Sequence, residues 1–412
     1  MSYSEKNVIK ASKGSELLGK KITLCVTGSV SAYRAIDLAR ELIRHGADVY
    51  VVMSKDSQLI VHPYAFEWAT GNPVVTEITG KVEHIFLAEE VDLILVAPAT
   101  ANTIAKVAHG ISDTPVTLTL TVALGEGVPV LMVPAMHEPM YENPILMEAL
   151  ERLREIGVRI MPPRREEAKA KFPEIEDIVF EVMDMLYIKD LKGRKFLITA
   201  GPTLEYIDRV RILTNKSSGK MGVYLAKEAY LRGGEVTLII GDTDLDVPSG
   251  IKKIRVETTE EMHKMVLDEV TSGEYDVFIS AAAPVDYKPA KEIKSKIDSR
   301  RNEKLEIEFV TTPKIVEAVK KKDKDIYVVA FKAVCGLDDE EIIEKAVKYA
   351  GERGFELVVA NDVCRPGVGF AEESNEVFIV DPNGLVEHIP ITSKKLIATK
   401  ILNLVRKNLE SK

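Results

Sequence analysis

The strongest constraint on the fold is a pattern of strand, glycine-rich turn, helix and strand that occurs twice along the chain. The first copy begins with KITLCVT at residues 21–27, and apolar residues then recur at helical spacing over residues 32–45. The second copy begins with KFLITA at residues 195–200 and leads through a glycine-containing loop into a helical pattern over residues 221–232. Each helix pattern ends at glycine before a new strand, which is typical of units that join parallel strands. The sequence therefore predicts an α/β protein with two tandem Rossmann-like domains and mainly parallel sheets.

Later apolar runs extend both sheets, and a polar connection separates the two domains. We expect further strands at residues 91–97, 128–133, 276–283, 327–331, 356–362 and 376–381. A charged, proline-containing stretch and a predicted helix over residues 175–188 lie between the halves, so the predicted domains are residues 1–188 and 189–412. Ligands of such folds bind at the carboxyl ends of the strands, where most of the informative polar residues fall.

Charge and hydropathy exclude several classes of function. The chain has 412 residues and a net charge of −9, which argues against nucleic acid or an acidic membrane as a partner. The first 20 residues contain no apolar run of signal-peptide length, so we expect a cytoplasmic protein. The most apolar stretch, residues 114–136, is interrupted by glycines and a glutamate and is predicted to form two buried strands around a turn. The three cysteines, Cys25, Cys335 and Cys364, show no metal-ligand spacing and are expected to be reduced thiols.

Residues 199–222 (TAGPTLEYIDRVRILTNKSSGKMG) carry the strongest functional signal. The segment leaves a strand, passes three glycines and enters a helix, an arrangement that presents backbone N–H groups to an anion. Arg211 and Lys220 add positive charge, and an ordinary strand-to-helix turn would not require them or Asn215. The spacing is not that of a Walker loop, because Thr214 stands where its first glycine is needed. The segment therefore predicts a site for a phosphorylated ligand.

Three segments of the first half follow three predicted strands, at residues 28–31, 97–106 and 134–141. Because the carboxyl ends of parallel strands meet at one edge of a sheet, we expect these segments to form one crevice. The Gly-Ser turn, APATANTIAK and PAMHEPMY resemble segments of the flavin-dependent cysteine decarboxylases, which are homo-oligomers that bind FMN. The resemblance implies an FMN site formed by Gly28, Ser29, Ser31, Ser54, Pro98, Ala99, Thr100, Asn102, Ala135 and Met136.

The same resemblance implies catalytic roles for two histidines. His84, in VEHIFLAEE, matches the family's histidine at the substrate, although alone it would suit a surface helix. Its imidazole can accept a proton near neutral pH while flavin withdraws electrons. In PAMHEPMY, His137 stands where the family has an Asn that reads the substrate carboxylate, and Tyr141 stands where it has a Trp. An imidazole N–H can still donate to a carboxylate, so we expect His137 to keep that role.

A second departure from the family concerns the proton donor. Bacterial bifunctional relatives carry a Cys in a glycine-rich lid after this domain's last strand, whereas residues 164–178 (RREEAKAKFPEIEDI) contain none. Lys169 and Lys171 could close over the substrate, or they could belong to a solvated charge run. Two alternatives therefore stay open for the first half: a flavin-binding regulatory module without turnover, and a flavin prenyltransferase.

The anion loop at residues 199–222 resembles the signature of phosphopantothenate–cysteine ligases, which are fused behind such decarboxylases in bifunctional coenzyme A biosynthesis proteins. The resemblance implies that CTP and Mg²⁺ activate the 4′-phosphopantothenate carboxylate as an acyl-cytidylate, which the amine of cysteine attacks. Asn215 would hold the carboxylate or the acyl-cytidylate, and Arg211 would lie near the same anions. Asp286 would contact CTP and the metal, and Lys296 would stabilise the charged phosphate during turnover.

Further segments of the second half match the nucleotide site of these ligases. The resemblance implies substrate and CTP contacts from Arg211, Ser280, Ala281, Ala282, Asp286, Lys296, Thr312, Pro313, Lys314, Ile315, Phe331, Lys348 and Arg353. Plain alternatives stay open for some of them. Phe331 could belong to the core, the lysines at positions 288, 291, 294 and 296 could form a solvated basic face, and Asn361 and Asp362 could cap a turn.

The two resemblances cover nearly the whole chain and imply successive reactions. Residues 189–412 would join cysteine to 4′-phosphopantothenate, and residues 1–188 would decarboxylate the product to 4′-phosphopantetheine. The families also imply trimer-based flavoprotein units with FMN between subunits, and dimers of the ligase domain.

Overall fold

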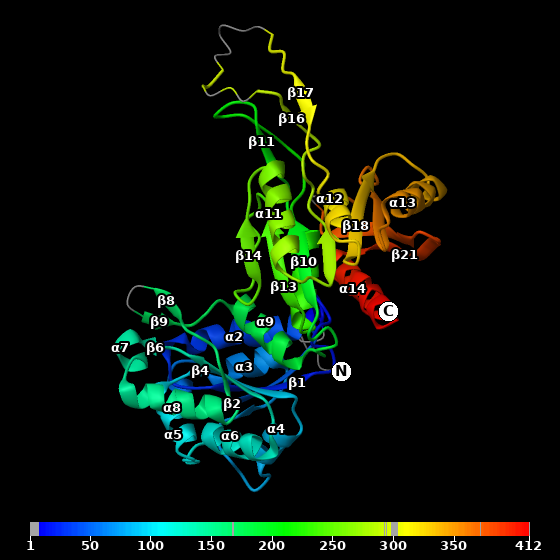
Figure 1. The fold of residues 1–412 in the computed structure, drawn as a ribbon. Coiled ribbons are helices and arrows are strands. Elements are labelled where there is room, and N and C mark those ends of the chain that lie inside the picture. The colour runs from blue at the N-terminus through cyan, green and yellow to red at the C-terminus, as the bar shows by residue number, and fades with distance from the viewer. Residues whose placement is uncertain are drawn as a thin grey trace. The chain divides into compact units, whose positions relative to one another are not determined.

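The computed structural model describes residues 8–166, 169–291, 293, 295–297, 304–370 and 372–411. The chain divides into two compact units, Met1–Tyr187 and Ile188–Lys412, and each contains its own large sheet (Figure 1). The predicted α/β class with mainly parallel sheets is confirmed. The described part of the chain has no helix with the length and apolar character that a membrane crossing requires.

The first unit is built on a six-stranded parallel sheet in the order β3-β2-β1-β4-β5-β7. Its strands are β1 (Lys21–Val26), β2 (Asp48–Met53), β3 (Val74–Val75), β4 (Leu93–Ala99), β5 (Val130–Pro134) and β7 (Arg159–Ile160). Strands β1 and β4 are almost wholly buried, as expected when helices cover both faces of a parallel sheet. The strand order changes direction between β1 and β4, which is where such sheets bind ligands.

Eight α-helices and two short 3₁₀ helices surround this sheet among the described residues of the first unit. They are η1 (Val30–Tyr33), α2 (Arg34–Arg44), η2 (Ser57–Leu59), α3 (Pro63–Thr70), α4 (Glu83–Glu89), α5 (Ala101–Ala108), α6 (Pro115–Glu126), α7 (Glu138–Tyr141), α8 (Pro144–Glu155) and α9 (Ile175–Leu186). A small antiparallel sheet joins β6 (Met136–His137) to the hairpin of β8 (Arg164–Glu166) and β9 (Lys169–Lys171). The predicted helices over residues 32–45 and 175–188 are confirmed as η1–α2 and α9.

The expectation of two buried strands over residues 114–136 is wrong for its first part, which forms helix α6. Alternating valines and threonines favour a strand. Three terminal signals favour a helix instead: Thr114 and Thr117 form a reciprocal capping box, Pro115 occupies the first turn, and Gly127 ends the helix with a φ of 72°. Helix termination and capping therefore outweigh β propensity in this segment.

The second unit contains an eight-stranded sheet in the order β14-β13-β10-β15-β18-β19-β20-β21. Pairing is parallel from β14 to β19 and antiparallel from β19 to β21. The strands are β10 (Lys195–Ala200), β13 (Glu235–Ile240), β14 (Lys252–Arg255), β15 (Val277–Ser280), β18 (Tyr327–Val334), β19 (Leu357–Asp362), β20 (Ser374–Asp381) and β21 (Gly384–Ser393).

Helices cover both faces of this second sheet and bury two apolar clusters. Helices α10 (Lys220–Leu231) and α14 (Lys394–Glu410) contribute to one cluster. Helices α11 (Thr259–Ser272), α12 (Ile315–Lys322) and α13 (Asp339–Arg353) contribute to the other. Two antiparallel ribbons extend the unit beyond the sheet (Figure 1): β11 (Leu204–Tyr206) with β12 (Ile212–Thr214), and β16 (Tyr287–Pro289) with β17 (Phe309–Thr311).

Candidate active sites

In the first unit, hydrogen bonds tie together the three loops expected to form a crevice. The Ser29 hydroxyl donates to the Ala135 carbonyl at 3.2 Å, which links the turn after β1 to the loop after β5. The Thr27 hydroxyl donates to the Pro98 carbonyl at 2.7 Å, which links β1 to the end of β4. The Ala135 N–H donates to the Ala99 carbonyl at 3.2 Å. The structure therefore brings the segments at residues 28–31, 97–106 and 134–141 to one place.

The turn after β1 also has the features of an anion site. The Ser29 side chain caps η1 and accepts the Ser31 N–H at 3.4 Å. Gly28 lies against the neighbouring loop, because a Cβ at this position would come within 2.6 Å of the Asp56 Cβ. Ser54 follows the adjacent β2, and its hydroxyl accepts the Ser57 N–H at 3.3 Å, which holds the start of that loop. A side chain larger than hydrogen at position 28 would therefore displace this part of the crevice.

The loop after β4 presents the start of α5 to the same crevice. The Thr100 hydroxyl caps α5 by accepting the Thr103 N–H at 3.3 Å, while the Thr100 N–H donates to the Thr27 hydroxyl at 3.1 Å. Asn102 is exposed in the first turn of that helix, and Met136 is half-buried in β6. The predicted cofactor residues of this loop therefore lie at a helix N-terminus, where partial positive charge favours an anion.

His84 lies half-buried on α4, and its Nδ1 atom is buried without a hydrogen-bond partner in the described part of the chain. A buried polar atom of this kind is costly unless a ligand or another group satisfies it. Helix α4 packs on α6, and among the described residues no hydrogen bond joins His84 to the three loops. The structure therefore does not connect His84 to the crevice, and its substrate role stays a prediction.

His137 is exposed in β6, where its backbone pairs with Lys169 of β9. The base of the hairpin is tied to the start of α2, because Arg34 donates to the Phe172 carbonyl at 3.3 Å and pairs with Glu174 at 2.9 Å. Tyr141, in contrast, is buried in the core, so this replacement for the family's Trp packs inside the unit. Residues 167–168 of the predicted lid, and the side chain of Lys169, lie outside the described residues, whereas Lys171 is half-buried.

The second unit contains a pocket of about 590 Å³ at the carboxyl ends of β15, β18 and β19 and beside the start of α10. The predicted residues that line it are Asn215, Ser280, Ala281, Ala282, Asp286, Thr312, Pro313, Lys314, Ile315 and Phe331. Four lysines and two carboxylates contribute to its wall: Lys220, Lys314, Lys332, Lys394, Asp286 and Glu317. Lysines outnumber carboxylates, so the pocket favours anionic ligands.

Two glycines let the anion loop approach the sheet. Gly219, with a φ of 78°, precedes α10, and a Cβ there would come within 3.1 Å of the Gly201 Cα. A Cβ on Gly222 would come within 2.6 Å of the Ala200 Cβ, so α10 packs directly on β10. The loop is further held by the Ser218 hydroxyl, which donates to the Phe370 carbonyl at 2.9 Å. These contacts explain why the sequence places glycines at both positions.

Asn215 donates both of its amide hydrogens to backbone carbonyls of the pocket wall. Its Nδ2 atom donates to the carbonyls of Ala283 at 3.1 Å and Pro284 at 3.0 Å, which leaves the amide oxygen for a ligand. Asp286 pairs with Lys314 at 2.5 Å, and the Thr312 N–H donates to the Asp286 carbonyl at 3.0 Å. The segment around β17 is therefore fixed against the loop that follows β15.

Arg211 and Lys296 do not line this pocket, although they share an anchor. Arg211 pairs with the fully buried Asp208 at 2.5 Å, and the Ile297 N–H donates to the same carboxylate at 3.1 Å. Burial acts to raise the pKa of Asp208, but the backbone N–H groups of residues 297, 210 and 211 and the Arg211 guanidinium outweigh it and hold that pKa well below its usual range. Asp208 thus ties the exposed Lys296 segment to the loop of the β11–β12 ribbon. Lys294 lies outside the described residues.

Lys348 and Arg353, expected near the nucleotide, also lie outside the pocket lining. Lys348 is exposed beside Glu352, and Arg353 pairs with Glu317 at 3.1 Å. Both project from α13, which supplies Tyr349 to the pocket instead. A shift of one position along a helix turns a side chain by about 100°, and a segment match cannot resolve such a shift.

Lys332 and Lys394 line the pocket but were not predicted from the sequence. Lys394 is only 3% exposed and donates to the carbonyls of Gly369 at 2.9 Å and Phe370 at 3.1 Å. Burial and the nearby charge of Lys220 lower the pKa of Lys394 to about 8. Asn361 and Asn375 also reach the lining and bond to each other at 3.3 Å. Lys394 and Asn375 come from β20–α14, a part of the chain without a glycine-rich or motif signal.

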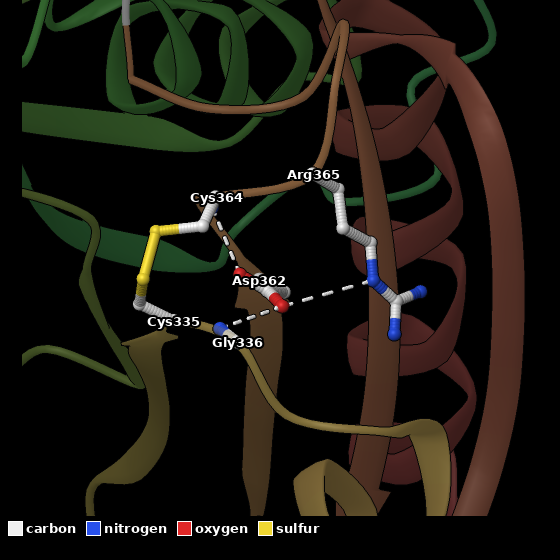
Figure 2. Close-up of a disulfide and its surroundings, with 5 residues drawn as sticks. All are labelled: Cys335, Gly336, Asp362, Cys364 and Arg365. Carbon is white, nitrogen blue, oxygen red and sulfur yellow. Dashed lines mark hydrogen bonds and ion pairs between the residues drawn. A yellow bond between two sulfur atoms is a disulfide. The ribbon is translucent and has the colours of Figure 1, made fainter.

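The expectation that all cysteines are reduced is wrong for two of the three. Cys335 and Cys364 form a disulfide (Figure 2), and their Cα atoms lie 5.1 Å apart. Cys25, in contrast, is free and buried. The two residues follow adjacent parallel strands, β18 and β19, so the fold brings together thiols that are 29 positions apart in sequence. Asp362 completes the cluster by accepting the N–H groups of Cys364 at 2.8 Å and Gly336 at 3.0 Å (Figure 2).

Cys335, Asp362 and Cys364 lie close enough together to share a metal ion, but the disulfide occupies both sulfurs. Arg365 also approaches Asp362, with its Nε atom 3.9 Å from the carboxylate. Asp286, the predicted metal ligand, does not belong to this group. The cluster therefore fastens the ends of two strands whose neighbouring residues line the pocket.

Comparison with known proteins gives matches to both halves. Residues 10–187 match the family model described as Flavoprotein, and residues 191–409 match that of the DNA/pantothenate metabolism flavoprotein C-terminal domain. A "Coenzyme A biosynthesis bifunctional protein CoaBC" of Thermococcus kodakarensis is 46% identical over 98% of each chain, and one of Methanocaldococcus jannaschii is 36% identical over 98% of each chain. The crystal structure of the C-terminal domain of a CoaBC protein is 31% identical, with a TM-score of 0.45, and covers 54% of this chain and 100% of its own.

Proposed function

The chain belongs to the family of bifunctional coenzyme A biosynthesis proteins, and on that premise we propose that it catalyses two successive steps of this pathway. Residues 189–412 join cysteine to 4′-phosphopantothenate at the expense of CTP, and residues 1–188 decarboxylate the resulting 4′-phosphopantothenoylcysteine. The observation that carries the proposal is the lysine-rich pocket of the second unit, where the predicted ligase segments meet. Two phosphorylated substrates suit such a pocket.

The three joined loops of the first unit fit a bound FMN. Close backbone approach at Gly28 and the N-terminus of α5 suit the phosphate. Bound FMN would supply the two-electron chemistry that decarboxylation requires. The protein's own contribution is to hold the substrate carboxylate with His137 and to accept a proton at His84.

The missing lid cysteine leaves the final proton donor of the first unit to another group. His137 pairs through its backbone with β9, so hairpin β8–β9 and the expected carboxylate-binding residue form one sheet. We propose that this hairpin covers the substrate and that Lys171 or a water molecule returns the proton. If Lys171 returns the proton, a Lys171→Met variant should slow the formation of 4′-phosphopantetheine more than it slows the release of CO₂. Equal slowing of both steps would instead assign Lys171 to substrate binding.

In the second unit, the pocket lysines would hold the phosphates of both substrates, and Asn215 would orient the nucleophile. The free amide oxygen of Asn215 can only accept a hydrogen bond. It therefore suits the N–H of the attacking cysteine amine as a ligand group, whereas a carboxylate oxygen of the substrate would need a donor. Asp286 is one of the two carboxylates of the pocket lining, and so few carboxylates suit Mg²⁺ held mainly by nucleotide phosphates and water. Arg211 and the segment of Lys296 are both held by Asp208 outside the pocket lining. They would contact ligands in the pocket only if the β11–β12 ribbon moved or if a second subunit supplied them.

The proposal is tested by assaying each activity of the purified chain. CO₂ release from 4′-phosphopantothenoylcysteine should occur in the wild type and fall by about a thousandfold in His84→Asn, because loss of a general base costs 10²–10⁴-fold. Amide formation from cysteine should require CTP and should be unaffected by His84→Asn. Equal CO₂ release by the two proteins would contradict the decarboxylase assignment, and undiminished ligation with ATP alone would contradict the choice of CTP.

One alternative for the first unit is favoured by a specific observation. The absent lid cysteine and the buried Tyr141 are both departures from the decarboxylase pattern, and they fit a flavin-binding module that regulates ligation without turnover. In that case the purified protein would bind FMN, show no CO₂ release, and change its ligase rate when the flavin is removed. Formation of a prenylated flavin from a prenyl phosphate would instead support the prenyltransferase alternative.

We further propose a cytoplasmic homo-oligomer with trimer-based first units and dimeric second units. Mass photometry of the flavin-loaded chain tests the oligomer directly. A monomer at micromolar concentration would contradict it.

A further inference from the structure

Lys332 is a cation of the pocket wall that has no carboxylate partner among the described residues. It follows Phe331 on β18, is half-buried and lines the pocket. The two carboxylates of the lining are already paired with other cations, Asp286 with Lys314 and Glu317 with Arg353. A partly buried charge without a counter-ion is unfavourable unless a ligand supplies the opposite charge.

The surroundings of Lys332 add positive charge instead of neutralising it. The pKa of Lys332 is lowered by burial and by the charges of Lys345 and Lys314. Burial and two like charges make the protonated amine costly in the absence of an anion. Lys332, Lys345 and Lys314, the last of which pairs with Asp286, together match a ligand that carries several negative charges on adjacent groups, such as the polyphosphate of a nucleotide.

Tyr349 fixes the position of the Lys332 amine. The Lys332 Nζ atom lies 4.3 Å from the centroid of the Tyr349 ring, within the range of a cation–π contact. The ring is itself held by an edge contact with the buried Phe355 at a centroid distance of 5.2 Å. Lys332 is thus held at the pocket wall by a contact that leaves its N–H groups available to a ligand.

Helix α12 offers a second group for the same anion. Residues 315–317 of its first turn line the pocket, and no side chain caps its N-terminus. Backbone N–H groups at an uncapped helix start are donors that need a partner and carry partial positive charge. An anion between this turn and Lys332 would satisfy both.

We propose that Lys332, held by Tyr349, binds the polyphosphate of the nucleoside triphosphate together with the first turn of α12. This inference rests on the proposed ligase function and assigns to Lys332 the contact that the sequence suggested for Lys348 and Arg353. Lys332 is a binding residue, and Tyr349 is a positioning residue that acts through it.

The test compares five variants in the full-length protein: Lys332→Met, Lys332→Arg, Tyr349→Leu, Tyr349→Phe and the control Lys264→Met, an exposed lysine of α11 outside the pocket lining. Loss of a charge-assisted hydrogen bond predicts that Lys332→Met raises the KM for CTP about ten- to a hundredfold, while the KM for cysteine stays unchanged. Lys332→Arg should stay within about threefold of the wild type, since it keeps the charge. Tyr349→Leu should raise the KM for CTP, Tyr349→Phe should leave it near the wild-type value because the ring is kept, and Lys264→Met should have no effect.

A direct binding measurement separates this inference from the proposed function. Calorimetry with inorganic tripolyphosphate and the full chain needs no turnover, and thermal melts show whether each variant is folded. Binding in the wild type that weakens at least tenfold in Lys332→Met supports the subsite even if ligation is absent. Equal tripolyphosphate affinity in the wild type and a folded Lys332→Met would overturn the inference, as would an equal loss of affinity in Lys264→Met.

Discussion

At the scale of single residues, two hydrogen bonds fix the amide of Asn215 in the second unit. Both of its N–H groups face backbone carbonyls, at 3.1 and 3.0 Å. An Asn215→Asp variant would place a carboxylate against these two oxygens and remove two hydrogen bonds, each worth about 1 kcal/mol. We expect ligation to fall at least tenfold while CO₂ release by the same chain is unchanged. A parallel loss of both activities would show a general folding defect instead.

Lys394 predicts a pH dependence at the residue scale. With a pKa of about 8, this buried amine is charged below pH 8 and becomes neutral as the pH rises above it, well before an ordinary lysine. The pocket therefore loses a positive charge between about pH 7 and pH 9, and the KM for anionic substrates should rise over that interval. The other charges that act on Lys394 are those of Lys220, Glu373 and Glu372, and Lys220 pairs with Glu373.

A Lys394→Arg variant keeps its charge throughout this interval, since an arginine is not deprotonated in proteins. Its KM should therefore stay flat between pH 7 and pH 9. Steady-state kinetics in both proteins, with thermal melts at each pH, provide the comparison. The same rise in the arginine variant would remove Lys394 as the cause.

At the scale of elements, the packing of α10 on β10 decides where the anion loop lies. A Cβ on Gly222 would come within 2.6 Å of the Ala200 Cβ and 2.7 Å of the Thr199 carbonyl oxygen. Gly222→Ala should therefore push the helix outward, cost about 1–3 kcal/mol of stability and weaken ligation. Urea unfolding followed by ligase activity measures both effects.

Gly351 on α13 gives the matched control, because nothing lies within 4 Å of a Cβ at that position. Gly351→Ala should stabilise the protein by about 0.5–1 kcal/mol through better helix propensity, without changing ligation. If the two alanine variants behaved alike, helix propensity and not close packing would govern α10.

At the scale of the whole molecule, each unit has apolar clusters formed from its own residues. The disulfide lies in the second unit only and closes a loop with a sequence separation of 29. In the chain-entropy model such a crosslink stabilises by about 3–4 kcal/mol. We therefore expect two thermal transitions, of which only that of the second unit falls on reduction, by about 10 °C for a unit of this size.

Release of flavin monitors the unfolding of the first unit in this experiment. Reductant should not change that transition, because Cys25 forms no disulfide, is fully buried and has a pKa that burial raises. In the double variant Cys335→Ser, Cys364→Ser, the second unit should melt at the temperature of the reduced wild type, with or without reductant. A transition of the second unit that ignores reductant in the wild type would show that the disulfide contributes nothing to stability.

Local patterns determined most of the architecture. Strands β1, β4, β10 and β18 and helices α2, α9 and α10 follow from apolar periodicity and flanking glycines, and these signals depend only on neighbours in sequence. Helix α6 was missed because its valines and threonines favour a strand, while its end signals decide for a helix. The family was also readable from the sequence, since its motifs lie in short contiguous segments.

Tertiary structure alone decided which side chains meet. The pairing of β18 with β19 brings Cys335 to Cys364, and the packing of α13 selects Tyr349 over Lys348 for the pocket. Lys332 lies on β18 and Lys394 at the start of α14, and both line one pocket. Burial lowers the pKa of both. Sequence determines local conformation through interactions between near neighbours. Contacts, burial and electrostatics of the site depend on residues far apart in the chain, and only the folded structure sets those distances.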